Sequence, residues 1–127
     1  MKNKFIINKN LIITFCIFFM ILTLFTIAAL IPRSLIEYIP PGGDDFVHVY
    51  IFSILSLLLC FSKIIDKKYI YLILFFYGFL IEILQLIMSR NFSYLDISYN
   101  FIGISLGISF YFFVNKIITL KKKKNSC

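Results

Sequence analysis

The sequence has few residues that carry charge, metal-binding or nucleophilic chemistry. Tryptophan is absent, histidine occurs once, and only 6 of the 127 residues are acidic. The three cysteines form an odd set without metal-ligand spacing, which argues against a disulfide framework or a cysteine metal site. Cys16 and Cys60 lie inside apolar runs and Cys127 is the last residue. We therefore interpret the first two as small buried hydrophobes and the third as a free thiol in the tail.

Apolar residues dominate what is present. They make up 61% of the chain, including 16 Phe and 8 Tyr, and the mean hydropathy is +0.94. Soluble domains are roughly half apolar, and so short a chain cannot bury this much apolar surface in a core of its own. The sequence predicts an integral membrane protein that forms a single domain over residues 1–127.

The apolar residues fall into four runs, and each is long enough to cross about 30 Å of hydrocarbon as a helix of about 20 residues. The runs are continuous and do not alternate, which disfavours strands. We expect an all-α bundle of four transmembrane helices, with spans at about 11–31, 46–65, 69–88 and 97–118. The first run exceeds the about 7–15 apolar residues of a signal peptide, so we favour an uncleaved anchor over a cleaved signal.

The basic residues predict the orientation of the chain in the membrane. With the N-terminus inside and four crossings, every Lys and Arg except Arg33 and Arg90 falls on the inner side. This asymmetry places both termini in the cytoplasm of a multi-pass protein of the cell (plasma) membrane. The lysine run at 121–124 is then a topology anchor beside anionic lipid headgroups, and nucleic-acid binding becomes a minor alternative.

The scarce polar residues within the runs share helix faces. Glu82 and Gln85 follow Gly78 at spacings of four and three in the third run, and Asp44 and His48 are four apart in the second. Residues spaced by three or four lie on one side of a helix.

In the fourth run, Asp96 and Asn100 continue into Gly103 and Gly107 along one stripe. The glycines of this stripe are typical of close helix packing. By the predicted topology, the polar residues of all three spans lie near the outer surface, where Arg90 sits at the rim. Glu82 is placed about 10 Å below Ser89, at 1.5 Å of rise per residue.

An ionisable side chain inside a membrane faces a partner or a water-filled cavity in most cases. We therefore predict a polar site in which His48 and Glu82 are candidate catalytic residues, either one acting as a general base. The candidate binding residues are Asp44, Gln85, Arg90, Asp96 and Asn100. No cofactor and no metal is predicted; a divalent ion held by His48, Glu82 and Asp96 stays open as an alternative, for which the loose spacing gives little support. The alternative is a polar clasp that only holds the helices together.

With these residues in place, the chain resembles the VanZ-like family of small bacterial membrane proteins. The family pattern begins with Asp-Lys-x-x-His at the head of a span and continues with Gly-x-x-x-Glu-x-x-Gln near the end of the next. It ends with Arg-x-x-Ser-x-x-Asp-x-x-x-Asn-x-x-Gly-x-x-x-Gly. The matching residues here are Asp44, His48, Gly78, Glu82, Gln85, Arg90, Ser93, Asp96, Asn100, Gly103 and Gly107.

The match covers about residues 44–107, and Asp45 stands where the family has Lys. The resemblance implies a four-helix membrane protein, linked in the best-known member to reduced susceptibility to teicoplanin-type glycopeptide antibiotics. The acidic Asp45 brings into question any role that needs a cation at that point.

Three hypotheses for function follow. The first is a polar pocket near the outer leaflet that binds, or acts on, an envelope component such as a lipid headgroup, a cell-wall precursor or a glycopeptide. The second is a structural or accessory membrane subunit. The third, a small transporter, is disfavoured because no acidic or basic group continues a path through the inner half of the last three spans.

Overall fold

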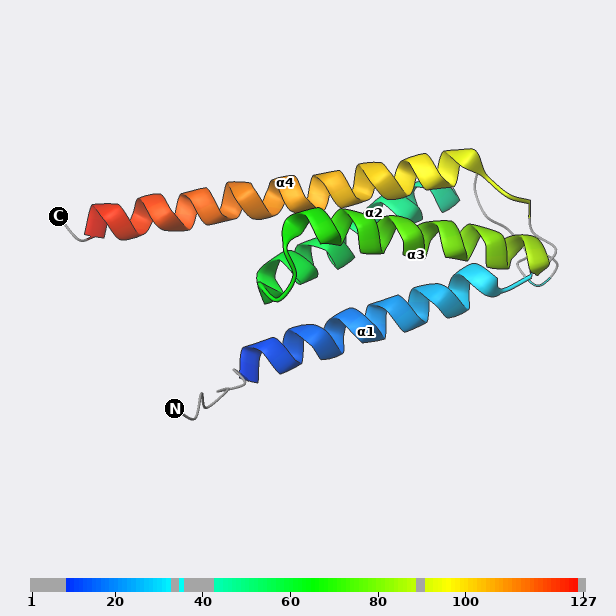
Figure 1. Ribbon diagram of the computed structural model, residues 1–127, viewed down its shortest axis with the longest axis horizontal. Helices are drawn as coiled ribbons and strands as arrows, with labels where there is room; N and C mark the ends of the chain where they lie inside the picture. The colour runs from blue at the N-terminus through cyan, green and yellow to red at the C-terminus, as the bar shows by residue number, and fades with distance from the viewer. Residues whose placement is uncertain (1–8, 33–34, 36–42, 89–90, 126–127) are drawn as a thin grey trace.

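The computed structural model describes residues 9–32, 35, 43–88 and 91–125, and within these ranges the protein is helical with no strand. The helices are α1 (Lys9–Leu30), α2 (Gly43–Ser62), α3 (Lys67–Ile87) and α4 (Tyr94–Asn125) (Figure 1). Helix α1 begins at the same end of the bundle at which α4 ends, and α4 reaches beyond the other three helices at this end. At the opposite end, α3 ends close to the start of α4.

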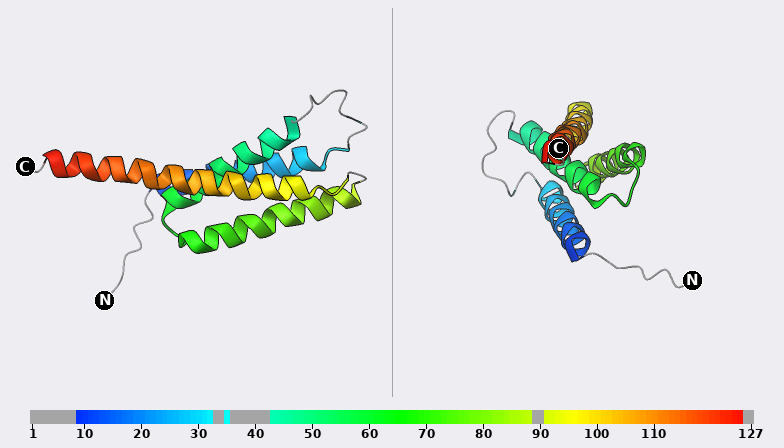
Figure 2. Two further views of the ribbon diagram at one scale, coloured as in Figure 1. Left: turned by 90° about the horizontal axis from the view of Figure 1, so that it is seen from above. Right: turned by 90° about the vertical axis from the view of Figure 1, so that its left-hand side faces the viewer.

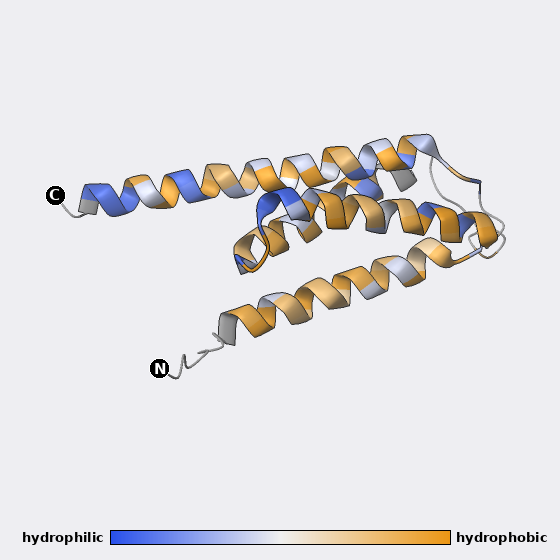
Figure 3. Ribbon diagram, in the orientation of Figure 1, coloured by the Kyte–Doolittle hydropathy of each residue, from blue (hydrophilic) through white to orange (hydrophobic). Residues whose placement is uncertain are grey.

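Three of the described helices are long and apolar enough to cross a membrane. They are Leu11–Leu30, Lys67–Ile87 and Tyr94–Lys124, whereas the apolar part of α2, Phe46–Ser62, is shorter. Apolar residues run along the length of the bundle, and the strongly polar stretches are the lysine-rich end of α4 and the first turn of α3 (Figure 3). The chain is therefore a helical protein suited to lipid, as its composition predicts.

The helix ends differ from the boundaries predicted from hydropathy. Helix α2 ends at Ser62 rather than near residue 65, because Lys63 adopts a left-handed backbone conformation with φ of 56° that stops the helix. Helix α4 starts at Tyr94 and continues to Asn125, well past the predicted span of 97–118. Lysine is a good helix former, so a helix does not have to end where the hydrocarbon does.

Helices α2 and α4 form the closest interface of the bundle, and two glycines of α4 make it possible. A methyl group at Gly103 would lie 2.5 Å from the carbonyl oxygen of Val49. At Gly107 it would collide with the carbonyl oxygen of Ser53 and the hydroxyl of Ser56. The prediction that these glycines serve close helix packing is confirmed. Between membrane helices such packing replaces the hydrophobic driving force of a soluble core.

Helix α1 packs on α2 and α3 but, within the described residues, makes no contact with α4 (Figure 2). The hydroxyl groups of Thr26 on α1 and Tyr77 on α3 lie 2.8 Å apart. Because α1 contacts the bundle along one face only, Cys16 is exposed, and the prediction that it is buried is wrong. Cys60 on α2 is buried as predicted, and Cys127 lies outside the described residues.

Candidate functional site

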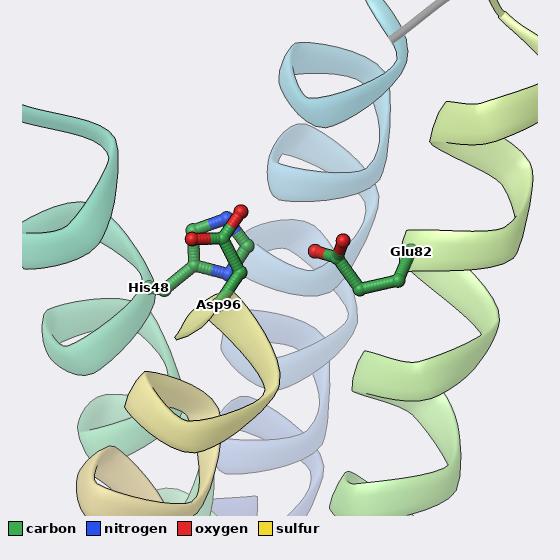
Figure 4. Close-up of side chains that lie close together, drawn as sticks. All are labelled: His48, Glu82 and Asp96. Atoms are coloured by element: carbon green, nitrogen blue, oxygen red, sulfur yellow. The ribbon is translucent and has the colours of Figure 1, made fainter. Parts of the chain in front are cut away.

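Three ionisable side chains from three helices meet at the end of the bundle where α3 ends and α4 begins. His48 comes from α2, Glu82 from α3 and Asp96 from α4, and their polar ends point toward one another (Figure 4). One potential ligand atom of each residue lies within 4.8 Å of those of the other two. The helical spacings in the sequence place each residue on the inner face of its helix, and the antiparallel order of the helices brings the three to one level.

The cluster is shielded from its surroundings. The side chain of Glu82 is 0% exposed and that of His48 is 5% exposed, while Asp96 is half-buried. The imidazole ring of His48 meets the ring of Phe25 edge-on at 5.4 Å between centroids. It also lies parallel to the ring of Phe52 at 6.5 Å. Burial of charged groups among apolar ones is unfavourable unless they are paired or bound to an ion.

Asn100 of α4 fixes the orientation of the imidazole. The Nδ1 of His48 lies 2.8 Å from the Oδ1 of Asn100. An amide oxygen can only accept a hydrogen bond, so Nδ1 carries the proton and donates. In the neutral ring the lone pair is then on Nε2, the atom that is able to accept a proton or bind a metal.

The other end of the Asn100 amide faces α3. Its Nδ2 lies 2.6 Å from the position that a Cβ atom would take at Gly78, one turn before Glu82. A larger residue at position 78 would therefore displace this amide. Asn100 is 2% exposed, and its Nδ2 has no hydrogen-bond partner in the described part of the chain. Buried donors without a partner are rare, because they lose the hydrogen bonds that water would supply.

Ser93 connects Glu82 to the start of α4. Its backbone N–H donates to the Oε2 of Glu82 at 3.0 Å. Its hydroxyl oxygen accepts a hydrogen bond from the backbone N–H of Asp96 at 3.2 Å, and this caps α4. Ser93 is not among the candidate site residues predicted from the sequence, although it belongs to the family pattern. The Ser-x-x-Asp spacing of Ser93 and Asp96, a helix-capping signature, is the signal that could have found it.

Of the remaining candidates, Gln85 is not brought into the cluster. The side-chain amide of Gln85 turns to α1 and donates to the carbonyl oxygen of Ala29 at 3.1 Å, so it ties α1 to α3. Arg90 and the side chain of Asp44 lie outside the part of the chain that the structure describes.

Comparison of the chain with protein-family models, with curated proteins and with solved structures found no match. The cluster offers an imidazole lone pair and two carboxyl groups, which can accept protons, accept hydrogen bonds from hydroxyl or ammonium groups, or bind a cation.

Proposed function

We propose that the protein is a VanZ-like protein of the bacterial cell membrane with four transmembrane helices and both termini in the cytoplasm. Two observations support this topology. Helix α1 begins and α4 ends at one end of the bundle. The last turn of α4 carries Lys122, Lys123 and Lys124, and basic residues favour the cytoplasmic side. The cluster of His48, Glu82 and Asp96 then lies toward the outer leaflet.

At this site the protein binds an envelope component and in this way lowers susceptibility to glycopeptide antibiotics such as teicoplanin. The observation that carries the proposal is the convergence of His48, Glu82 and Asp96 from three helices within 4.8 Å. Lipid headgroups, cell-wall precursors and glycopeptides all carry hydroxyl, amide or ammonium groups that donate to such acceptors. If a reaction takes place, the Nε2 of His48 or the carboxylate of Glu82 is placed to act as the general base.

Direct binding to the purified protein in lipid nanodiscs tests the proposal. The probes are teicoplanin, a lipid-linked cell-wall precursor, and vesicle lipids with anionic or zwitterionic headgroups. We expect at least one probe to bind the wild type. Glu82→Gln and His48→Gln should weaken its binding about 10- to 100-fold, the effect of a lost hydrogen bond to a charged group of about 1.5–3 kcal/mol.

The matched control is Ser98→Ala. Ser98 lies two residues from Asp96 on α4, is exposed, and donates a hydrogen bond to the carbonyl oxygen of Tyr94 in its own helix. This variant should bind like the wild type. Absence of binding for every probe, or equal losses in all three variants, contradicts a binding site at this cluster. In cells, Glu82→Gln and His48→Gln should raise teicoplanin susceptibility at equal amounts of membrane-inserted protein, and Ser98→Ala should not.

A structural or accessory role is the second candidate, and the direction of the polar bonds favours it. His48 bonds from α2 to α4, and Gln85 bonds from α3 to α1. A cluster that only locks the helices predicts that Glu82→Gln lowers the folded yield, while probe binding and susceptibility per folded molecule stay unchanged. Measuring the amount of folded protein alongside each readout separates the two roles.

A further inference from the structure

We propose that His48, Glu82 and Asp96 form a binding site for one divalent metal ion, with each residue supplying one ligand. The three ligand atoms lie within 4.8 Å of one another and come from three different helices. His48 and Glu82 are 34 positions apart in the sequence, and Glu82 and Asp96 are 14 apart, so the fold is what brings the three together. One imidazole nitrogen with two carboxylate oxygens is a ligand set that suits first-row divalent ions such as Zn²⁺ and Mn²⁺.

The shared position of two carboxyl groups is the first argument for an ion. Glu82 is completely buried and Asp96 is half-buried, so two acidic groups share a small volume of low polarity. Like charges at this separation repel, and each loses most of its hydration. A divalent cation between them neutralises both carboxylates and leaves His48 as a neutral ligand.

The surroundings of the three residues are the second argument. Histidines that bind metals donate their other ring N–H to an acceptor, which fixes the tautomer. His48 does this through Nδ1 to the Oδ1 of Asn100 at 2.8 Å, which leaves Nε2 for the ion. Glu82 is held in the same manner by the backbone N–H of Ser93 at 3.0 Å.

The other end of the buried Asn100 amide is a third observation. The side chain is only 2% exposed, yet its Nδ2 has no hydrogen-bond partner in the described ranges. The group lies against Gly78, one turn from Glu82 on α3. A water molecule or another oxygen ligand on the ion would give this donor the acceptor that the protein does not supply.

The distances require only small movements. Metal–ligand bonds of about 2.1 Å in a tetrahedral site separate the ligand atoms by about 3.4 Å. One potential ligand atom of each residue lies within 4.8 Å of the other two, so closing on an ion moves such atoms together by about 1.4 Å. The side chain of Glu82, with three rotatable bonds, can make this movement without a shift of α3.

Within the described residues the site has three protein ligands, fewer than a purely structural zinc site has. Structural zinc sites are closed by four protein ligands, whereas sites that act on a substrate keep a position open. The open position would take a phosphate or hydroxyl oxygen of the envelope component. The inference that the ion contacts the envelope component rests on the proposed function. Metal binding by His48, Glu82 and Asp96 does not depend on that function.

The test is metal binding by the full-length protein in nanodiscs after treatment with a chelator. Zn²⁺ is measured by equilibrium dialysis and elemental analysis, and Mn²⁺ by electron paramagnetic resonance, because thiols contribute little to Mn²⁺ binding. We expect one ion per chain and weaker binding of Mg²⁺ and Ca²⁺, which do not favour imidazole. Asp96→Asn and His48→Gln should weaken binding at least about tenfold, and Ser98→Ala should leave it unchanged.

Asn100 provides a readout that a general loss of stability would not reproduce. Asn100→Leu removes the acceptor for the Nδ1 of His48 and should weaken metal binding about 10- to 100-fold. Asn100→Asp keeps an acceptor oxygen and should restore binding. The inference would be overturned by a wild type that binds neither ion, or by Asp96→Asn and His48→Gln variants that bind the ions as tightly as the wild type.

The outcomes for metal and for envelope component are distinguishable, because metal is titrated without any other ligand and probe binding is repeated with a chelator present. If a probe binds and the chelator has no effect, the role of the ion in that binding is refuted and the proposed function stands; if the wild type binds no ion in the direct titration, the metal site is refuted. If the ion binds but no probe does, the metal site stands and the proposed function fails.

Discussion

The substitution Gly103→Ala should loosen the interface between α2 and α4 and disturb the polar cluster at the same time. The added methyl group would lie 2.5 Å from the carbonyl oxygen of Val49, whereas ordinary contact begins at about 3.4 Å. The atom on α2 belongs to the backbone and cannot rotate away. The two helices must therefore separate by about 0.9 Å at this level.

The separation reaches the site because Asn100 lies one turn before Gly103 on the same stripe of α4. It lengthens the hydrogen bond between His48 and Asn100 from 2.8 Å to about 3.7 Å, beyond hydrogen-bonding distance. Overpacking costs about 1–3 kcal/mol and the lost hydrogen bond about 1 kcal/mol. We expect the free energy of unfolding to fall by about 2–4 kcal/mol.

Denaturant titration of the protein in bicelles measures this change, and Ser109→Ala is the control. Ser109 is exposed on the same helix, so its variant should unfold like the wild type. A Gly103→Ala protein within about 0.5 kcal/mol of the wild type would refute the close-packing argument, because surface substitutions have effects of that size.

Two further predictions use the same unfolding assay. Ser93→Ala removes the hydroxyl that caps α4 and should lower the free energy of unfolding by about 1 kcal/mol. Ser98→Ala is the control and should unfold like the wild type. A Ser93→Ala protein of unchanged stability would mean that the cap contributes nothing. Lys63→Gly removes the steric strain of a side chain at φ of 56° and should raise the free energy of unfolding by about 0.5–1 kcal/mol. Lys63→Ala keeps a Cβ atom and should not raise it. Equal effects of the two substitutions would argue against backbone strain.

The helical fold and the meeting of His48, Glu82 and Asp96 were within reach of the sequence. The reason is that helix periodicity is local: spacings of three and four fix the face of a residue without knowledge of its neighbours. An antiparallel order of the helices then determines which ends meet. Both facts can be read from a chain whose polar residues are few.

The partner of each side chain was less accessible. Glu82 and Gln85 were expected to share one site, yet Gln85 bonds to the carbonyl oxygen of Ala29 on α1. Residues three apart on a helix differ in direction by about 60°, enough for each to face a different neighbour. Which helix lies in each direction depends on the packing of the whole bundle, and the sequence pattern does not contain it.

The helix ends were predicted least well, for a related reason. Hydropathy reports where lipid would be, whereas a helix ends where the backbone changes direction, as at Lys63. The capping hydroxyl of Ser93 and the extension of α4 to Asn125 follow from backbone hydrogen bonding and helix propensity.

The length of α4 has a mechanical consequence. Its 32 residues form one uninterrupted helix, about 48 Å long at 1.5 Å per residue, with Asp96 in its first turn and Lys124 in its last. A straight helix resists twisting and bending, so a tilt or rotation at one end is carried to the other. If an anionic membrane surface held these lysines, as the proposed topology has it, a change in that surface would act on the angle at which Asp96 faces His48 and Glu82.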